Sequence, residues 1–276
     1  MDCEGLINKL KDAPWYHGQL GALRVIKGRT PRYGRLREPL PKSLQERLKQ
    51  RGITRLFWHQ ARAIEALRRG EHTAVMTSTA SGKTLCYLLP ILENQQEHPN
   101  DCALLLYPTK ALAQDQLRKT NDLIAEEKVV ANVYDGDTPV SRRPAIRRAS
   151  HLIYSNPDML HTAILPNHNL WASFFSNLRW VVLDEVHSYR GVFGSHTANV
   201  IRRLRRMCSL YGSEPTFACC SATVTNPKEL VEGLTGLPFT VIDKDGSPSG
   251  DKHFAFWDAW ATVPAAPPAE EAAEAA

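Results

Sequence analysis

The chain has 276 residues, of which 43% are hydrophobic and 23% charged, and a formal net charge of +5. A chain of this size forms one large core with appendages, because single cores seldom grow beyond about 250 to 300 residues. No apolar run approaches the roughly 18 to 20 residues that span a bilayer, and the first ten residues lack the features of a secretory signal. We therefore expect a cytoplasmic protein without membrane partners.

The cysteines form neither a CxxC pair nor a group with histidines at metal-ligand spacing. A disulfide framework is atypical of a cytoplasmic chain of this length. We expect free, buried thiols at Cys3, Cys86, Cys102, Cys208, Cys219 and Cys220.

Residues 1–52 are expected to form an N-terminal appendage, since proline and glycine recur through residues 14–41 and interrupt any long periodic pattern. Within this appendage, residues 43–50 are expected to be helical. The pattern then predicts a helix at residues 58–69 that ends at Gly70, and a strand at residues 74–77 that leads through a loop into a helix from Gly82.

Short apolar runs alternate with helical stretches through the rest of the chain. Buried strands joined by helical crossovers predict an α/β fold whose mostly parallel sheet is covered by helices on both faces. Val241 and Ile242 are expected to close that sheet. The other predicted strands are residues 103–107, 151–155, 180–183 and 216–220, and the predicted helices between them include residues 111–124 and 195–210.

The last part of the chain changes in composition. Residues 243–251 are rich in turn formers, and residues 251–262 continue as a linker-like segment. Residues 263–276 contain almost only alanine, proline and glutamate and lack apolar periodicity, so we expect a disordered tail.

Residues 77–84 fit the end of the GxxxxGK[ST] pattern, with Thr77 in the place of the first glycine. Such a loop wraps backbone N–H groups around a phosphate at a helix N-terminus. Lys83 can neutralise phosphate charge and the Thr84 hydroxyl can ligate Mg²⁺, so ATP and Mg²⁺ are the expected cofactors. A polar loop with a chance GKT is the alternative for this segment taken alone. The loop residues expected to bind nucleotide are Thr79, Ala80, Ser81, Gly82, Lys83 and Thr84.

Asp184 and Glu185 follow the strand predicted at residues 180–183. Ligands gather beyond the carboxyl ends of the strands in a doubly wound sheet, so this acidic pair can meet the phosphate loop in space. We expect Asp184 to hold Mg²⁺, Glu185 to orient the attacking water, and His187 to link the nucleotide state to Ser221 and Thr223. The predicted catalytic residues are therefore Lys83, Asp184, Glu185 and His187.

With these motifs in this order, the sequence resembles the superfamily 2 helicases over residues 53–241, which correspond to their first RecA-like domain. The strings TASGK, PTKALAQDQ and DEVHSYRGVFGSH narrow the resemblance to DExH DNA helicases of the mitomycin repair factor A type. The resemblance implies a RecA-like P-loop domain at residues 53–250. The matching segments are residues 56–60 (Q motif), 107–116 (motif Ia), 135–139 (a glycine-containing loop), 155–161 (motif Ib) and 221–223 (motif III).

The resemblance also implies roles for residues in these segments. Gln60 would read adenine through its amide, and Phe57 offers a stacking face. Single-stranded or partly duplex DNA is the implied partner, gripped mainly through its backbone, with RNA as an alternative. Arginines at residues 142–148 and 202–206 are better explained as a solvated helix face. The implied strand contacts are Thr109, Lys110, Gln114, Asp137, Thr138 and Asn156.

The family mechanism needs a second RecA-like domain that supplies arginine fingers. No match to its motifs IV to VI follows residue 223, so we expect a chain truncated before that domain, which is missing or supplied in trans. Such a chain would bind ATP and DNA, hydrolyse ATP slowly and not unwind a duplex alone. The alternatives are a free-standing ATP-dependent module that docks a second domain or partner protein, and an RNA helicase domain.

Overall fold

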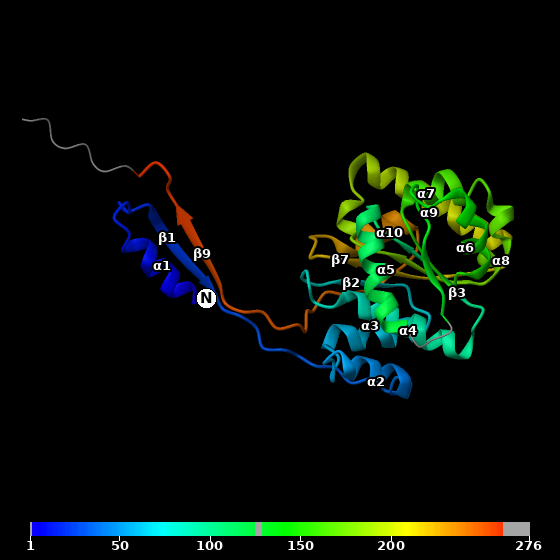
Figure 1. Cartoon of the computed structure of the whole chain (residues 1–276), viewed down its shortest axis with the longest axis horizontal. Coiled ribbons are helices and arrows are strands. Elements are labelled where there is room, and N and C mark those ends of the chain that lie inside the picture. The colour runs from blue at the N-terminus through cyan, green and yellow to red at the C-terminus, as the bar shows by residue number, and fades with distance from the viewer. Residues whose placement is uncertain (1, 125–128, 262–276) are drawn as a thin grey trace, which may run out of the picture. The chain divides into compact units, whose positions relative to one another are not determined.

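The computed structural model describes residues 2–124 and 129–261, which form two compact units (Figure 1). The large body comprises Arg32–Ser247, and the smaller unit comprises the described residues before Arg32 and from Pro248 onward. The division thus differs from the boundaries expected after residues 52 and 250. The expected tail at residues 263–276 lies outside the described residues. Within the described ranges, no helix is long and apolar enough to cross a membrane.

The large body is built on a parallel sheet, for which the described residues supply seven strands in the order β4-β5-β3-β6-β7-β2-β8. Every neighbouring pair is parallel. The carboxyl ends of all the strands therefore reach the same edge of the sheet, where Met76 pairs with Ser221. The strands are β2 (Thr73–Met76), β3 (Cys102–Leu106), β4 (Ala131–Val133), β5 (Leu152–Ser155), β6 (Leu178–Leu183), β7 (Thr216–Ser221) and β8 (Thr240–Ile242).

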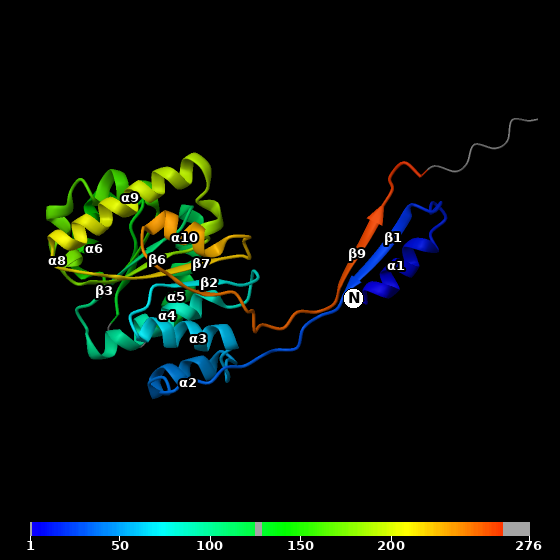
Figure 2. The same cartoon turned by 180° about the vertical axis from the view of Figure 1, so that it is seen from behind.

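The sheet separates two apolar cores, because successive side chains of a strand point to opposite faces. Leu104 and Leu106 of β3 enter one core, and Ala103 and Leu105 enter the other. Helices thus cover both faces, as the sequence predicts (Figure 2). On the Ala103 face lie α2 (Lys42–Gln50), α3 (Trp58–Arg68), α4 (Lys83–Glu97) and α5 (Lys110–Ile124), and on the other α6 (Arg143–Ala149), α7 (Pro157–Met159), α8 (Ala172–Ser176), α9 (Gly191–Leu210) and α10 (Pro227–Thr235).

The smaller unit contains α1 (Cys3–Lys11) and an antiparallel ribbon of β1 (Leu20–Ile26) and β9 (Lys252–Trp257). Trp15 and Tyr16 pack their rings against Trp257, with centroids 6.1 and 6.0 Å apart. The segment expected to be linker-like therefore contains a strand that pairs with the appendage.

The cysteines are all free, as expected. Cys86, Cys102, Cys208, Cys219 and Cys220 are buried. Cys3 is exposed, against the expectation of burial, because α1 has no buried residue.

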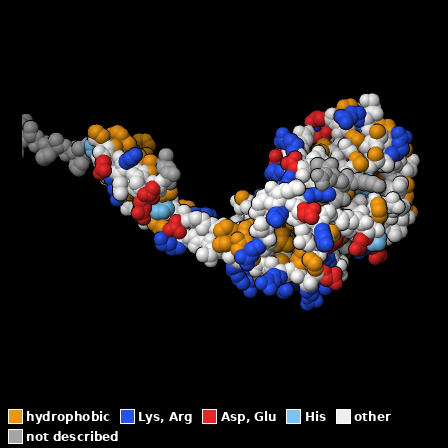
Figure 3. All heavy atoms as spheres, turned by 60° about the horizontal axis from the view of Figure 1, so that its bottom comes forward, with side chains coloured by type: hydrophobic (Ala, Val, Ile, Leu, Met, Phe, Trp, Pro, Cys, Tyr) orange, Lys and Arg blue, Asp and Glu red, His pale blue; other side chains and the backbone are white. Residues whose placement is uncertain are grey.

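Lys and Arg side chains are interspersed with hydrophobic ones on the face of the large body shown in Figure 3. Near the start of α3, arginines lie over aromatic rings. The guanidinium carbon of Arg55 is 3.8 Å from the centroid of the Tyr33 ring, and Arg32 and Arg62 lie 5.8 and 5.7 Å from the Trp58 ring. Contacts of this kind hold the long arginine stems against the body.

Candidate nucleotide and nucleic-acid sites

The predicted site residues divide into two groups along the carboxyl edge of the sheet. The phosphate loop follows β2, Ser221 ends β7, and Asp184 follows β6, and these three strands are adjacent. The expected strand contacts follow β3, β5 and β4, which are adjacent on the other half of the sheet. The topology therefore brings the residues expected to bind nucleotide to one half of the edge and the expected nucleic-acid contacts to the other.

The phosphate loop requires backbone conformations that only some residues adopt readily. Ala80 has φ 61° and Gly82 has φ 78°, both in the left-handed region. A Cβ atom at Gly82 would lie 2.6 Å from Nε2 of Gln60. Glycine is therefore needed at position 82 both for its conformation and for the close approach of Gln60.

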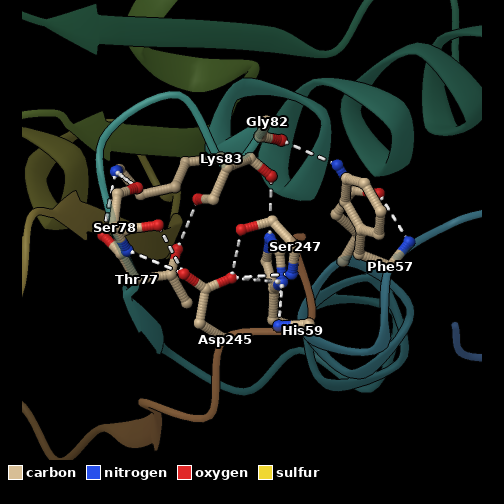
Figure 4. A network of polar contacts seen from close by, with 11 residues as sticks. Phe57, His59, Thr77, Ser78, Gly82, Lys83, Asp245 and Ser247 are labelled. Carbon is tan, nitrogen blue, oxygen red and sulfur yellow. Dashed lines mark hydrogen bonds and ion pairs between the residues drawn. The ribbon is translucent and has the colours of Figure 1, made fainter. Parts of the chain in front are cut away.

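Lys83, the first residue of α4, turns back into this loop. Its Nζ atom donates to the carbonyl oxygens of Ser78 at 2.8 Å and Thr77 at 3.1 Å (Figure 4). The Thr77 hydroxyl lies 2.7 Å from the hydroxyl of Ser81, and both side chains are buried. Thr77, which replaces the usual glycine, thus joins the two ends of the loop. Thr79 and Ala80 lie exposed between them.

Gln60 is buried and bonded on both sides of its amide. Its Oε1 atom accepts from the Phe57 N–H at 2.8 Å, and its Nε2 atom donates to the Gly82 carbonyl at 3.0 Å. The ring of Phe57 stacks between those of Tyr33 and His59, at 5.7 and 6.0 Å. In this structure Gln60 therefore ties the start of α3 to the phosphate loop, and its reading of adenine stays a prediction.

Asp184 is buried at the end of β6. Its Oδ2 atom accepts from the Tyr87 hydroxyl at 3.2 Å, and its Oδ1 atom accepts from the Glu185 N–H at 2.8 Å. Burial raises the pKa of Asp184 to about 6, although the hydrogen bond from Glu185 and the charge of Lys83 act in the opposite direction. A cation bound to this carboxylate would offset the unfavourable effect of burial on its charge.

Glu185 is held in the left-handed region, with φ 51°. Its Oε2 atom is buried and has no hydrogen-bond partner among the described residues, although His187 Nδ1 lies 3.3 Å away. His187 instead bonds Ser221, through its main-chain N–H at 3.2 Å and Nδ1 at 3.0 Å. The structure therefore brings His187, two residues after Glu185, into contact with Ser221, as the sequence-based coupling hypothesis requires. Thr223, the other expected coupling residue, is exposed.

The residues present fit a magnesium–nucleotide complex. Mg²⁺ takes hard oxygen ligands and is usually bound by one or two protein groups together with phosphate oxygens and water. Asp184 and Thr84 offer a carboxylate and a hydroxyl, and Thr84 Oγ1 contacts Gln116 Oε1 at 3.1 Å. Among the described residues there is no cluster of three or more His, Cys, Asp or Glu that could bind a metal by itself. The orphaned Oε2 atom of Glu185 leaves an acceptor for a water molecule.

The expected strand contacts lie at the start of α5 and in the segments that directly follow β4 and β5. Lys110 Nζ is 2.8 Å from Asp137 Oδ1, and both side chains are largely exposed. Gln114 and Thr138 donate to opposite oxygens of buried Asp135, at 3.3 and 3.1 Å.

Thr109 and Asn156 act at helix starts. Thr109 Oγ1 accepts from Leu112 N–H at 3.4 Å and Asn156 Oδ1 accepts from Met159 N–H at 2.8 Å. Exposed Lys110 is accordingly the residue of this group best placed to meet a phosphate, while Thr138 and Asn156 are buried.

Four residues in or beside the phosphate loop were not predicted as site residues, namely Ser78, Asp245, Ser247 and His59. Asp245 follows β8, the edge strand that pairs with β2, and contacts Ser78, Ser247 and His59. Burial alone would raise the pKa of Asp245, but hydrogen bonds from Ser78 and Ser247 lower it well below its ordinary value. The sequence gives little signal for Asp245, because it lies three residues after β8, whereas Asp184 directly follows β6.

A sequence profile of the DEAD/DEAH box helicases matches residues 58–230. The chain is 51% identical over 234 residues to the uncharacterized ATP-dependent helicase YprA of Bacillus subtilis, which covers 83% of this chain and 31% of that protein. It is 40% identical over 264 residues to the ATP-dependent helicase hrq1 of Schizosaccharomyces pombe, which covers 92% of this chain and 25% of that protein.

A solved helicase structure is also similar to most of this chain. The crystal structure of the DUF1998 helicase MrfA bound to DNA and AMPPNP has a TM-score of 0.87 and 46% identity to this chain, over 92% of this chain and 36% of that one. The chain thus spans between 25% and 36% of the length of these three proteins. Because the family profile covers more than half of its residues, the chain belongs to the DEAD/DEAH box helicases.

Proposed function

We propose that this chain is the ATP- and nucleic-acid-binding motor domain of an ATP-dependent DNA helicase. The division of the sheet edge supports this proposal. Lys83, Asp184 and Glu185 lie on the half formed by β2, β7 and β6, and exposed Lys110 lies on the half formed by β3, β5 and β4. One continuous sheet therefore connects a nucleotide site to a strand-binding surface.

Each nucleotide-site residue has a definite task. Lys83 exchanges the carbonyl oxygens of Thr77 and Ser78 for phosphate oxygens, while Asp184 and Thr84 would hold Mg²⁺. ATP supplies the phosphoryl group, and Mg²⁺ neutralises charge on its oxygens. Glu185 accepts a hydrogen bond from the attacking water through its Oε2 atom, which has no hydrogen-bond partner among the described residues. His187 lies between Glu185 and Ser221 and contacts the Ser221 hydroxyl. A movement of Glu185 during hydrolysis would therefore be transmitted through His187 to Ser221.

DNA is the proposed partner. The chain is similar to MrfA, whose structure was solved with DNA and AMPPNP. Lys110 is the exposed cation of the strand-contact group, and a backbone-gripping surface of this kind makes binding depend on salt. Measuring the affinity of the chain for single-stranded DNA and for RNA of the same sequence distinguishes the DNA proposal from the RNA alternative.

Full motor activity is proposed to need a further RecA-like domain. Arginine fingers from such a domain raise phosphoryl-transfer rates by about 10³ to 10⁵. The relatives contain long regions beyond the match, since this chain covers 31% of YprA. We therefore expect the 276-residue chain to bind ATP, hydrolyse it slowly and not separate duplex strands by itself.

The test is nucleotide binding and ATP hydrolysis by wild type, Lys83→Ala and Glu185→Gln, with and without single-stranded DNA. Lys49→Ala, at an exposed position near the end of α2, controls for the loss of a lysine. Wild type and Lys49→Ala should bind Mg²⁺–ATP equally, and Lys83→Ala should bind it at least tenfold more weakly. Equal binding by wild type and Lys83→Ala would refute the site, and rapid duplex unwinding by wild type alone would refute the need for a further domain.

A further inference from the structure

Asp245 anchors the second residue of the phosphate loop. Its Oδ2 atom accepts from both the N–H of Ser78, at 3.2 Å, and the hydroxyl of Ser78, at 2.5 Å. The Asp245 side chain is only 6% exposed. One carboxylate, which is remote from Ser78 in sequence but adjacent in space, thus binds both the main chain and the side chain of Ser78 (Figure 4).

The same serine also holds Lys83. The N–H of Ser78 donates to Asp245, while the carbonyl of Ser78 accepts from Lys83 Nζ at 2.8 Å. A carboxylate outside the loop and an ammonium group inside it therefore bind opposite sides of one residue. Displacing Asp245 frees Ser78, and with it the carbonyl to which Lys83 is bonded.

His59 supports the other end of the loop. Its Nδ1 atom lies 3.1 Å from the Gly246 N–H, which can only donate, so Nδ1 is the acceptor and Nε2 carries the proton. Nε2 then donates to the Ser81 carbonyl at 3.1 Å. Neutral, fully buried His59 thereby connects the segment that contains Asp245 to the loop residue before Gly82.

The segment that carries Asp245 is itself fixed. Ser247 donates to Asp245 Oδ1 from its N–H at 2.8 Å and its hydroxyl at 2.7 Å. A Cβ atom at Gly246 would lie 2.6 Å from the Arg32 carbonyl oxygen and 2.8 Å from the Trp58 nitrogen. The backbone at Gly246 is therefore packed too closely for a side chain, and Asp245 cannot shift without moving its neighbours.

We propose that Asp245 is a positioning residue of the nucleotide site, which acts through Ser78 to hold the phosphate loop and Lys83 ready for the phosphates of ATP. This inference rests on the proposed function, because it takes the loop to be the nucleotide site. Because Asp245 already holds the loop in place, no part of the free energy of ATP binding is needed to order it. The contact between Asp245 and Ser78 therefore strengthens nucleotide binding.

The experiment measures Mg²⁺–ATP affinity with a fluorescent ATP analogue, below the lowest unfolding temperature of any variant. Asp245→Asn keeps the size of the side chain but replaces one of its acceptor oxygens by a donor. We expect its affinity to fall by about tenfold, the effect of losing one hydrogen bond to a charged group. Asp243→Asn, which removes an exposed charge two residues earlier, should bind as wild type does.

Ser78→Ala gives an independent test, because it removes only the hydroxyl bond to Asp245 and disturbs folding least. We expect Ser78→Ala to lose less ATP affinity than Asp245→Asn. In the variant that carries both substitutions, the loss of binding free energy should be less than the sum of the two single losses, since both act on one contact. A purely structural Asp245 would lower the unfolding temperature without changing the ATP affinity of the folded molecules. Unchanged or tighter ATP binding by Asp245→Asn, or additive losses, would overturn the proposal.

Lys83→Ala separates this inference from the proposed function. If Lys83→Ala binds ATP as wild type does, the loop is not the nucleotide site and both proposals fall. If Lys83→Ala loses binding while Asp245→Asn keeps it, only the role of Asp245 falls.

Discussion

Lys83 Nζ lies 2.8 Å from the carbonyl oxygen of Ser78, the residue whose N–H donates to Asp245. The lysine of the phosphate loop is therefore bonded to the loop's own main chain. Under the proposed function, a bound phosphate would replace these bonds rather than meet a free ammonium group, which would couple the shape of the loop to nucleotide binding.

Glu185→Gln should separate nucleotide binding from hydrolysis. The amide keeps the size of the side chain but is a poor base, and general-base catalysis typically contributes 10²- to 10⁴-fold. We expect Mg²⁺–ATP affinity within about threefold of wild type and a hydrolysis rate at least about 100-fold lower. Single-turnover hydrolysis with DNA present measures this. A variant that hydrolyses ATP as fast as wild type would exclude Glu185 as the residue that orients water.

Gly82→Ala and Gly70→Ala form a matched pair. Both glycines have similar left-handed backbones, with φ 78° and 76°, but only Gly82 has a neighbour within 4 Å of its missing Cβ, namely Gln60. Gly70→Ala should lower the free energy of unfolding by roughly 1 kcal/mol through conformation alone. Gly82→Ala should lower it further and weaken ATP binding. Urea unfolding of both variants checks this, and equal losses would mean that the approach of Gln60 is unimportant.

Lys110→Ala should weaken binding to single-stranded DNA and reduce the slope of log affinity against log salt by about one. Lys119→Ala is the control, since it lies on the same helix about 13 Å away and also pairs with an exposed aspartate. Fluorescence anisotropy at several salt concentrations measures both. If the two variants bind DNA alike, Lys110 does not contact the strand.

His59 should make stability depend on pH. Burial lowers its pKa below the ordinary value of 6.5, while Asp245 opposes this effect. The unfolded chain therefore takes up a proton below about pH 6.5 that the folded chain resists, and the stability that neutral His59 contributes at pH 7 is lost as the pH falls. Urea unfolding from pH 7.5 to 5.5 should show the gap between wild type and His59→Gln narrowing. If the free energies of unfolding of these two proteins change in parallel with pH, His59 is not the cause. His98→Gln removes an exposed imidazole and is the control.

The central sheet could be predicted from the sequence because its strands are apolar runs buried on both faces. The β4 strand was missed, since Ala131–Val133 is short and only half-buried. The pairing of Leu20–Ile26 with Lys252–Trp257 joins opposite ends of the chain, and no local pattern encodes it.

Residues of the candidate site could be predicted from the sequence only where they belong to a recognisable motif. Lys83, Asp184 and Glu185 stand out as sequence patterns beside apolar strands. Asp245 does not, because its contact with Ser78 exists only once β8 has paired with β2. The adenine contact expected of Gln60 stays a prediction, and the hydrogen bonds of its amide to Phe57 and Gly82 could not be read from the sequence.

The tight packing of Gly246 has a mechanical consequence. Wedged against residue 32 and the start of α3, the backbone there has no slack. A pull on the polypeptide beyond Ser247 would therefore be resisted at Gly246 before it reached Asp245 and the serine that holds Lys83. The packing of this one glycine thus shields the proposed nucleotide site from forces on the chain that leaves the large body.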